Sequence, residues 1–252
     1  MRVIAHVSDT HFGNDVQDPT DRATAVTEHL LAMSPRPDVL VVTGDLTDHG
    51  LTEEYAVARA WLDLWPGPLA VCPGNHDVRQ TFVEGLGVSS RSVVEANNLR
   101  FVMLDSLIDA VDGVRVDEGR VGDDQLAWLD EQLAASATPS FVCLHHPPTT
   151  IGLELMDPIG LLDTEALATV LDRHPHVVAT LVGHAHTMSA TTFAGRPLLI
   201  GGGIVSTVTS TAEPVETLWY SAPPSFAIHL IDDDLRITTH WRALPTKCSN
   251  PA

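Results

Sequence analysis

The stretch "HVVATLVGHAH" (residues 176–186) places two histidines directly after an apolar, β-branched run and a glycine. A run of this kind is typical of a buried strand, and α/β sheets bind their ligands outside the carboxyl ends of the strands. His184 and His186 are separated by one residue, so both side chains can leave the strand end on the same side. The stretch therefore predicts a strand that ends in a ligand or metal site.

Five further apolar runs lie at residues 2–9, 38–45, 68–75, 99–106 and 140–146, and each is too short for a helix. Segments with apolar residues at three- and four-residue spacing alternate with them and predict helices at 20–34, 51–65, 123–135 and 163–173. This alternation predicts an α/β fold in which helices cover a buried sheet. After residue 186 the pattern changes, and 190–201 and 225–244 predict late antiparallel hairpins, with the turn of the second at 232–234.

The chain has 252 residues without a low-complexity linker or internal repeat, so we expect a single domain over residues 1–252. Its formal net charge of −19 disfavours long nucleic acids and anionic membranes as partners. No apolar stretch approaches the roughly 20 residues needed to cross a bilayer. The three cysteines (Cys72, Cys143 and Cys248) form no disulfide framework, and a cytoplasmic location is expected.

Side chains that can bind metals follow five of the six predicted strands. They occur in "DTH" (9–11), "GDLTD" (44–48), "GNHD" (74–77), "LHH" (144–146) and "GHAH" (183–186). Because strand ends converge at one edge of an α/β sheet, these five clusters are expected to meet in one place. The glycines before Asp45, Asn75 and His184 allow the sharp turns that such a meeting requires.

The candidate ligands are too many for one ion. They are Asp9, His11, Asp45, Asn75, His145, His184 and His186. Oxygen and nitrogen donors of this kind suit manganese, iron or zinc, and seven of them fit two metals that share a carboxylate. Such a pair can clamp the attacking and leaving oxygens of a phosphoryl displacement, with a metal-bridging hydroxide attacking phosphorus in line.

The order and separation of "DTH", "GDLTD", "GNHD", "HH" and "GHAH" resemble those of the calcineurin-like metallophosphoesterases. Within this family, one branch contains class III cyclic nucleotide phosphodiesterases and glycerophosphodiesterases. The residues in and around the motifs resemble those of this branch: "SDTHF", "GDLTDHG", "CPGNHD", "LHHPP" and "MDPIG". The resemblance implies a four-layer α/β/β/α sandwich and a metal-dependent phosphoric diester hydrolase. It covers residues 9–186, so the late β-rich part at 186–252, which could serve dimerisation or substrate binding, has no assigned role.

The resemblance also implies a role for each site residue. It places Asp9, His11 and His186 on one metal and Asn75, His145 and His184 on the other, with Asp45 bridging. His76 matches the histidine that contacts the phosphate and protonates the leaving oxygen, and Asp48 matches the carboxylate that orients it. Asn75 also contacts substrate in this assignment. His145 is favoured as the ligand of the "HH" pair, which leaves His146 as a supporting residue or a substrate contact.

The sequence leaves several functions open. The first is hydrolysis of small diesters, foremost 3′,5′- or 2′,3′-cyclic nucleotides; glycerophosphodiesters and phosphomonoesters are alternatives at the same metals. A non-catalytic, protein-binding scaffold would be marked by lost ligands, and none is lost. A homodimer is also open. "MDPIG" (156–160) either lines the substrate pocket or forms an ordinary loop, and the role of Asp105 at the fourth strand end is unassigned.

Overall fold

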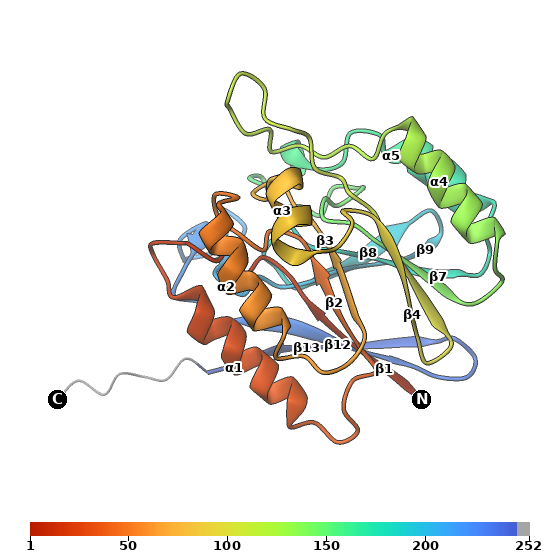
Figure 1. Ribbon diagram of the computed structural model, residues 1–252, viewed down its shortest axis with the longest axis horizontal. Helices are drawn as coiled ribbons and strands as arrows, with labels where there is room; N and C mark the ends of the chain where they lie inside the picture. Colours follow the sequence, from red (N-terminus) through yellow and green to blue (C-terminus); the bar gives the residue numbers. More distant parts are fainter. Residues whose placement is uncertain (246–252) are drawn as a thin grey trace.

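The computed structural model describes residues 1–245 and contains two large β-sheets stacked face to face (Figure 1). The first has the order β13-β12-β1-β2-β3, and the second has the order β4-β5-β6-β7-β9-β8. The strands of the first sheet are β1 (Arg2–Val7), β2 (Val39–Thr43), β3 (Leu69–Cys72), β12 (Ser225–Ile231) and β13 (Ile237–Ala243). Those of the second are β4 (Ser92–Ala96), β5 (Leu99–Met103), β6 (Ser140–Cys143), β7 (Val177–Val182), β8 (Ser189–Phe193) and β9 (Arg196–Ile200).

The central strands of both sheets are parallel, and helices connect all of them except β7 and β9, which are joined through β8. β1, β2 and β3 run parallel in the first sheet, and β5, β6, β7 and β9 run parallel in the second. The connecting helices are α1 (Pro19–Leu31), α2 (Thr52–Leu62), α4 (Asp123–Ala134) and α5 (Thr164–Asp172), whereas α3 (Arg79–Leu86) leads from β3 of the first sheet to β4 of the second. Short elements complete the described chain: η1 (Asp157–Ile159), β10 (Thr207–Val208) and β11 (Leu218–Trp219). The parallel strands of each sheet thus end at one common edge.

Alternate side chains of the buried strands point to opposite faces, and this produces three apolar layers. In β2, Leu40 and Val42 pack with α1 and α2, whereas Val41 packs between the sheets against residues such as Phe141 of β6. On the outer face of the second sheet, Val142 packs with residues of α4 and α5. The sequence-based expectation of a four-layer α/β/β/α sandwich is therefore confirmed.

The four predicted helices and six predicted strands are all present, with small differences at their ends. Each strand ends before its polar cluster: β2 stops at Thr43, whereas the predicted strand extended to Asp45. The clusters lie in the loops that follow the strands. Helix α3 and strand β4 were missed, since α3 has only eight residues and buries only Phe82 and Leu86.

The late hairpins are confirmed, and they extend the two sheets. β8 and β9 form an antiparallel pair whose second strand lies parallel to β7, and β12 pairs with both β13 and β1. The turn at 232–234 is present, with the Asp232 amide donating to the Arg236 carbonyl. Cys72 and Cys143 are buried free thiols, and Cys248 lies outside the described residues.

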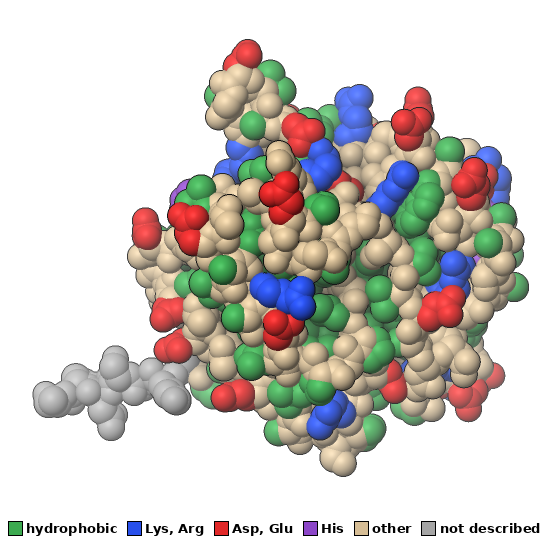
Figure 2. Space-filling view, in the orientation of Figure 1, with side chains coloured by type: hydrophobic (Ala, Val, Ile, Leu, Met, Phe, Trp, Pro, Cys, Tyr) green, Lys and Arg blue, Asp and Glu red, His purple; other side chains and the backbone are tan. Residues whose placement is uncertain are grey.

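Acidic and basic side chains are interspersed on the face in Figure 2, so the negative charge there forms no single patch. Within residues 1–245 no helix combines the length and the apolar character needed to cross a membrane.

The inter-sheet layer contains a cross-strand pair that can be tested. Phe101 and Phe141 are opposite each other in β5 and β6, fully buried, with stacked rings 5.3 Å apart. We expect Phe141→Ala to lower the free energy of unfolding by about 3–5 kcal/mol, because it leaves a cavity between the sheets. Urea denaturation measures this. The exposed Val114→Ala should change the value by less than about 0.5 kcal/mol; a similar loss in both variants would contradict this account of the core.

Candidate metal centre and active site

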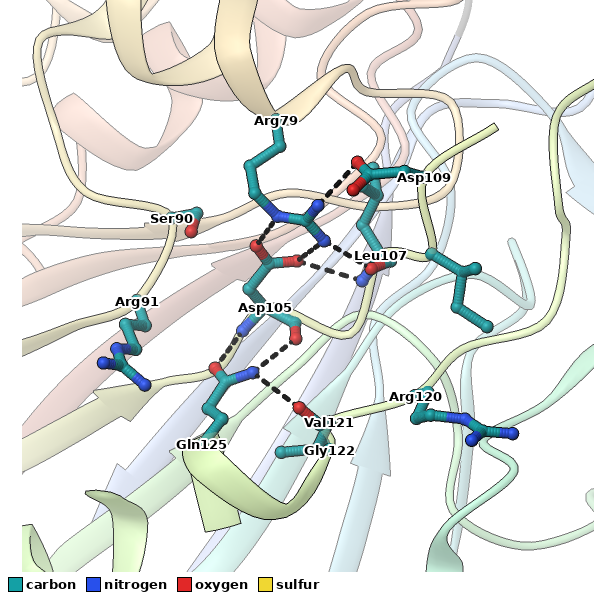
Figure 3. Close-up of a pocket in the computed structure, with 11 residues that line it drawn as sticks. Arg79, Ser90, Arg91, Asp105, Leu107, Asp109, Arg120, Val121, Gly122 and Gln125 are labelled. Carbon is teal, nitrogen blue, oxygen red and sulfur yellow. Dashed lines mark hydrogen bonds and ion pairs between the residues drawn. The ribbon is translucent and has the colours of Figure 1, made fainter. Parts of the chain in front are cut away.

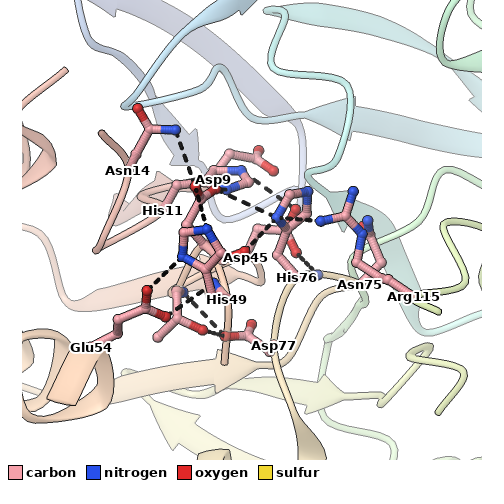
Figure 4. A network of polar contacts seen from close by, with 12 residues as sticks. Asp9, His11, Asn14, Asp45, His49, Glu54, Asn75, His76, Asp77 and Arg115 are labelled. Carbon is pink, nitrogen blue, oxygen red and sulfur yellow. Dashed lines mark hydrogen bonds and ion pairs between the residues drawn. The ribbon is translucent and has the colours of Figure 1, made fainter. Parts of the chain in front are cut away.

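The seven predicted ligands meet where the carboxyl ends of the two sheets face each other, and all are buried. Asp9 and His11 follow β1, Asp45 follows β2, Asn75 follows β3, His145 follows β6, and His184 and His186 follow β7. The convergence expected from strand ends is thus present, and it joins residues 177 positions apart in the chain. Figure 4 shows part of the resulting network.

Four of these residues form a first group in which one ligand atom of each lies within 4.8 Å of the others: Asp9, His11, Asp45 and His186. The Nε2 atoms of His11 and His186 are 3.2 Å apart. Nε2 of His186 lies 3.5 Å from Oδ1 of Asp9, and Nε2 of His11 lies 3.5 Å from Oδ2 of Asp45. The geometry gathers two carboxylates and two imidazoles around one point.

A second group lies beside the first. Oδ1 of Asn75 is 3.0 Å from both Nε2 of His145 and Nδ1 of His184, and these two nitrogens are 3.1 Å apart. Oδ2 of Asp45 is 3.3 Å from Nε2 of His145. The Asp45 carboxylate therefore stands between the two groups, as a shared ligand would.

Hydrogen bonds to residues outside the two groups determine which ring nitrogen of His11 and of His145 faces the cluster. Nδ1 of His11 donates to Oδ1 of Asp48 at 2.8 Å, and Nδ1 of His145 donates to the Thr43 carbonyl at 2.7 Å. Metal-binding histidines commonly direct their other N–H to a carboxylate or carbonyl in this way. Nε2 of His11 and of His145 therefore points into the cluster.

The charges of the cluster fit bound cations. Within residues 1–245, no lysine or arginine pairs with Asp9 or Asp45, and burial raises the pKa of Asp9 to about 6. Oδ2 of Asp9 and Nε2 of His184 are buried without a hydrogen-bond partner. Burial lowers the pKa of His145, but the Asp45 and Asp9 carboxylates and the bond to the Thr43 carbonyl together raise it to about 9. Two buried carboxylates without a lysine or arginine partner among residues 1–245, beside buried oxygen and nitrogen atoms without a hydrogen-bond partner, fit a metal site.

The backbone at the cluster is strained. Five ligand residues have a positive φ: Asp9, His11, Asp45, His184 and His186, between 49° and 67°. This left-handed conformation is uncommon for non-glycine residues and is held by surrounding bonds, such as those from the amides of Asp9 and His11 to the carbonyls of Gly44 and Asp45. The strained loops turn each side chain inward from its strand end.

Two of the expected glycines are required by close contacts. Gly44 has a φ of +89°, and a Cβ there would lie 2.5 Å from Nδ1 of His145. A Cβ on Gly74 would lie 2.2 Å from Oδ1 of Asp45 and 2.6 Å from its backbone nitrogen. The loops after β2 and β3 can approach each other only because both positions lack a side chain.

His76 and Asp48 lie together at the edge of the cluster. Nδ1 of His76 is 2.9 Å from the Asp48 carbonyl, and the His76 amide donates to Oδ1 of Asp45. Burial raises the pKa of Asp48, but hydrogen bonds from His11 and His76 hold it well below its usual range. Asp48 thus stays ionised and contacts both histidines, in keeping with the orienting role that the sequence suggested.

His146 is fully buried behind the cluster. Its Nδ1 is 2.8 Å from Oγ of Ser106, and its Nε2 is 3.1 Å from the carbonyl oxygen of Asp117. A ring nitrogen of His146 also lies within 4.8 Å of donor atoms of His145 and His184. Because both nitrogens are engaged, the geometry is that of a supporting residue; its contact with substrate stays a prediction.

Sequence reasoning missed Asp77 as a structural centre of the site. Its buried carboxylate accepts hydrogen bonds from the amides of Gly74, Leu46 and Thr47 and from the hydroxyls of Thr47 and Tyr55. It thereby ties the loop after β2 to the loop after β3. The signal was present, since Asp77 is the last residue of "GNHD", but the sequence grouped it only with the side chains that can bind metals.

Arg115 and Asp117 were also missed, because they lie in a loop without regular spacing. Oδ1 of Asp117 accepts from Nδ2 of Asn75 at 3.3 Å and from Nε of Arg115 at 2.6 Å.

Asp105, whose role was open, forms an ion pair with Arg79 at 2.6 Å, away from the metal ligands (Figure 3).

A two-sheet sandwich with aspartate, asparagine and histidine donors at its carboxyl edge defines a class of metal-dependent hydrolase. The chain belongs to the calcineurin-like phosphoesterase family, whose model matches residues 2–188. The family and the two buried groups together indicate a binuclear metal site in a phosphoester hydrolase. The resemblance read from the motifs is thus confirmed.

Relatives and solved structures agree with this family. The chain is 31% identical to the glycerophosphodiester phosphodiesterase GpdQ of Enterobacter lignolyticus, over 90% of this chain and 86% of the relative. It is 36% identical to a probable cyclic nucleotide phosphodiesterase of Synechococcus sp., over 77% and 79% of the two chains. A dimetal phosphatase from Danio rerio has the same fold, with a TM-score of 0.73 and 17% identity over 96% of each chain.

The close approach at Gly74 gives a direct test of the metal centre. We expect Gly74→Ala to displace Asp45, the carboxylate shared by both groups, and to reduce bound metal to less than half of the wild-type content, measured by plasma mass spectrometry. Gly67→Ala is the control, since a Cβ there comes no closer than 3.1 Å to any atom. Full metal content in Gly74→Ala would mean that Asp45 is not a ligand.

Proposed function

We propose that the protein is a phosphodiesterase that hydrolyses small phosphodiesters, foremost cyclic nucleotides, with glycerophosphodiesters as the alternative. The observation that carries the proposal is the convergence of seven donors in two groups that share Asp45. The names of the relatives support this choice, since they include a glycerophosphodiester phosphodiesterase and a probable cyclic nucleotide phosphodiesterase. A scaffold role is disfavoured because no donor position has been lost.

Two metal ions would bind to the two groups of donors. In this proposal Asp9, His11 and His186 hold one ion, Asn75, His145 and His184 hold the other, and Asp45 is shared. The donors are oxygen and nitrogen without a thiolate, which supports iron, manganese or zinc. When bound, such a pair lowers the pKa of a coordinated water to about 7 and offsets the negative charge that develops on the phosphoryl oxygens.

His76 would supply the proton to the leaving oxygen. Burial lowers its pKa, but the Asp45 and Asp48 carboxylates raise it above the ordinary value for histidine, so the charged ring is favoured. The contact of Nδ1 with the Asp48 carbonyl holds the ring and leaves Nε2 for the substrate. The same contact supports a positioning role of Asp48 toward His76. His146 would support Asp117 through its carbonyl, while the Asp117 carboxylate accepts from Nδ2 of Asn75.

The cavity beside the metal ligands supports a small substrate with an organic substituent. It has a volume of about 340 Å³, within the usual range for small-molecule sites. One wall is formed by Met156 and Ile159 of the "MDPIG" segment, and another by Val208, Leu218 and Tyr220 from the late part of the chain. These contacts support a role in substrate binding for "MDPIG" and for part of the region after residue 186.

The net charge of −19 further favours a small anion over a nucleic acid polymer. A homodimer and a cytoplasmic location stay predictions.

Substrate and metal assays test the proposal together. We expect about two metal ions per chain and faster turnover of bis(p-nitrophenyl) phosphate than of p-nitrophenyl phosphate, because the cavity accommodates an ester substituent. Parallel assays with 3′,5′-cyclic AMP, 2′,3′-cyclic AMP and glycerophosphodiesters identify the preferred diester. Asn75→Ala should lose at least about 100-fold in kcat/KM, since it removes one metal ligand.

Gln80→Ala is the matched control, because Gln80 is exposed on α3 and bonds only Glu84 among the described residues. Faster hydrolysis of the monoester would replace the proposal with a phosphomonoesterase. Absence of bound metal would remove the catalytic proposal and favour a scaffold.

A further inference from the structure

The loop between β5 and α4 brings a positive charge to the metal site. It rises above α3 in Figure 1 and is anchored near its end, where His146 contacts the Asp117 carbonyl and the Gly119 amide donates to Gly160. Arg115 lies two residues before Asp117, and its Nε contacts the Asp117 carboxylate at 2.6 Å. The anchored end of the loop therefore fixes where this guanidinium lies, although the side chain is nearly half exposed.

Arg115 and the Asp48 carbonyl both approach the same ring nitrogen of His76, which can satisfy only one of them. One of its terminal nitrogens is 2.9 Å from Nδ1 of His76, and that same Nδ1 is 2.9 Å from the Asp48 carbonyl (Figure 4). A guanidinium only donates hydrogen bonds, and a carbonyl only accepts them. Nδ1 cannot donate to the carbonyl and accept from Arg115 at once, so one of these groups is left unsatisfied. An anion between Arg115 and the metal ligands would give the guanidinium an acceptor.

Arg115 is the one arginine among the described residues that line the cleft, and none of these residues is a lysine. A second cavity, of about 470 Å³, shares Asp48, Asn75, His76 and Arg115 with the 340 Å³ cavity described above. Among residues 1–245, no other arginine and no lysine lines either cavity. An anionic substrate that enters a protein of net charge −19 therefore meets one permanent positive charge, at the junction of the two cavities.

We propose that Arg115 is a substrate-binding residue whose guanidinium binds a non-bridging phosphoryl oxygen at the junction of the two cavities. Asp117 orients the guanidinium through Nε, which leaves its terminal nitrogens for the phosphoryl oxygen. In an acyclic diester, such as bis(p-nitrophenyl) phosphate, the two ester substituents then extend into the cavities on either side, whereas the nucleoside of a cyclic nucleotide occupies one of them. This inference rests on the proposed diesterase function and adds a residue that contacts the phosphoryl group.

The test compares Arg115→Ala and Arg115→Lys with a matched control in the metal-loaded protein. Arg120→Ala is the control, because Arg120 lies in the same loop, is exposed and lines the separate pocket of Figure 3. Two quantities are measured: KM and kcat for bis(p-nitrophenyl) phosphate, and the Kd of inorganic phosphate by calorimetry. Thermal melting confirms that each variant is folded.

We expect Arg115→Ala to raise both KM and the Kd of phosphate by about 10-fold or more, the effect of losing one charge-assisted hydrogen bond. Arg115→Lys should fall between wild type and Arg115→Ala, because an ammonium retains the charge but not the fork of donors. Arg120→Ala should match wild type within twofold. Values for Arg115→Ala within twofold of wild type would overturn the proposal, as would a change in kcat with unchanged phosphate affinity.

The phosphate measurement separates this inference from the proposed function. If the metal-loaded wild type hydrolyses no diester, the diesterase proposal fails. The Kd of phosphate for Arg115→Ala and wild type then still decides whether Arg115 binds phosphoryl oxygens.

Discussion

Two buried carboxylates without a lysine or arginine partner among residues 1–245 are the constraint on which the rest of the site depends. Asp9 and Asp45 are almost fully enclosed, and the groups around them within residues 1–245 are imidazoles, an amide and backbone donors. Burial of such charges is costly unless a positive charge compensates it. The binuclear metal site that the family and the two buried groups indicate would supply that charge beside the five histidine and asparagine donors.

The strained backbone of the ligand loops follows from the same constraint. Seven side chains from two sheets reach one place only if the loops turn sharply at the strand ends. Five of these residues adopt left-handed conformations, and Gly44 and Gly74 allow the backbones to meet. Asp77 joins the two loops through bonds from backbone amides and from Tyr55. The fold thus stores strain at the site and compensates for it with buried hydrogen bonds.

Segments of the chain that contain none of the candidate metal ligands also line the cleft. The loop before α4 brings Arg115 and Asp117, and the segment after β9 brings Tyr220 and apolar residues. These parts give the site a charge and a shape that the metal ligands alone lack.

The sequence by itself determined the fold class and identified the donor residues that the structure brings together. Short β-branched runs and helical spacing predicted the sandwich, and donors at five strand ends predicted the metal site, because strand periodicity and strand-end chemistry are local properties. The tertiary structure decided how Asp45 lies between both groups, that His146 lies behind the cluster with both nitrogens engaged, and that Arg115 reaches His76. Such contacts join residues far apart in the chain through irregular loops, whose conformation depends on packing and on paired charges that no local spacing records.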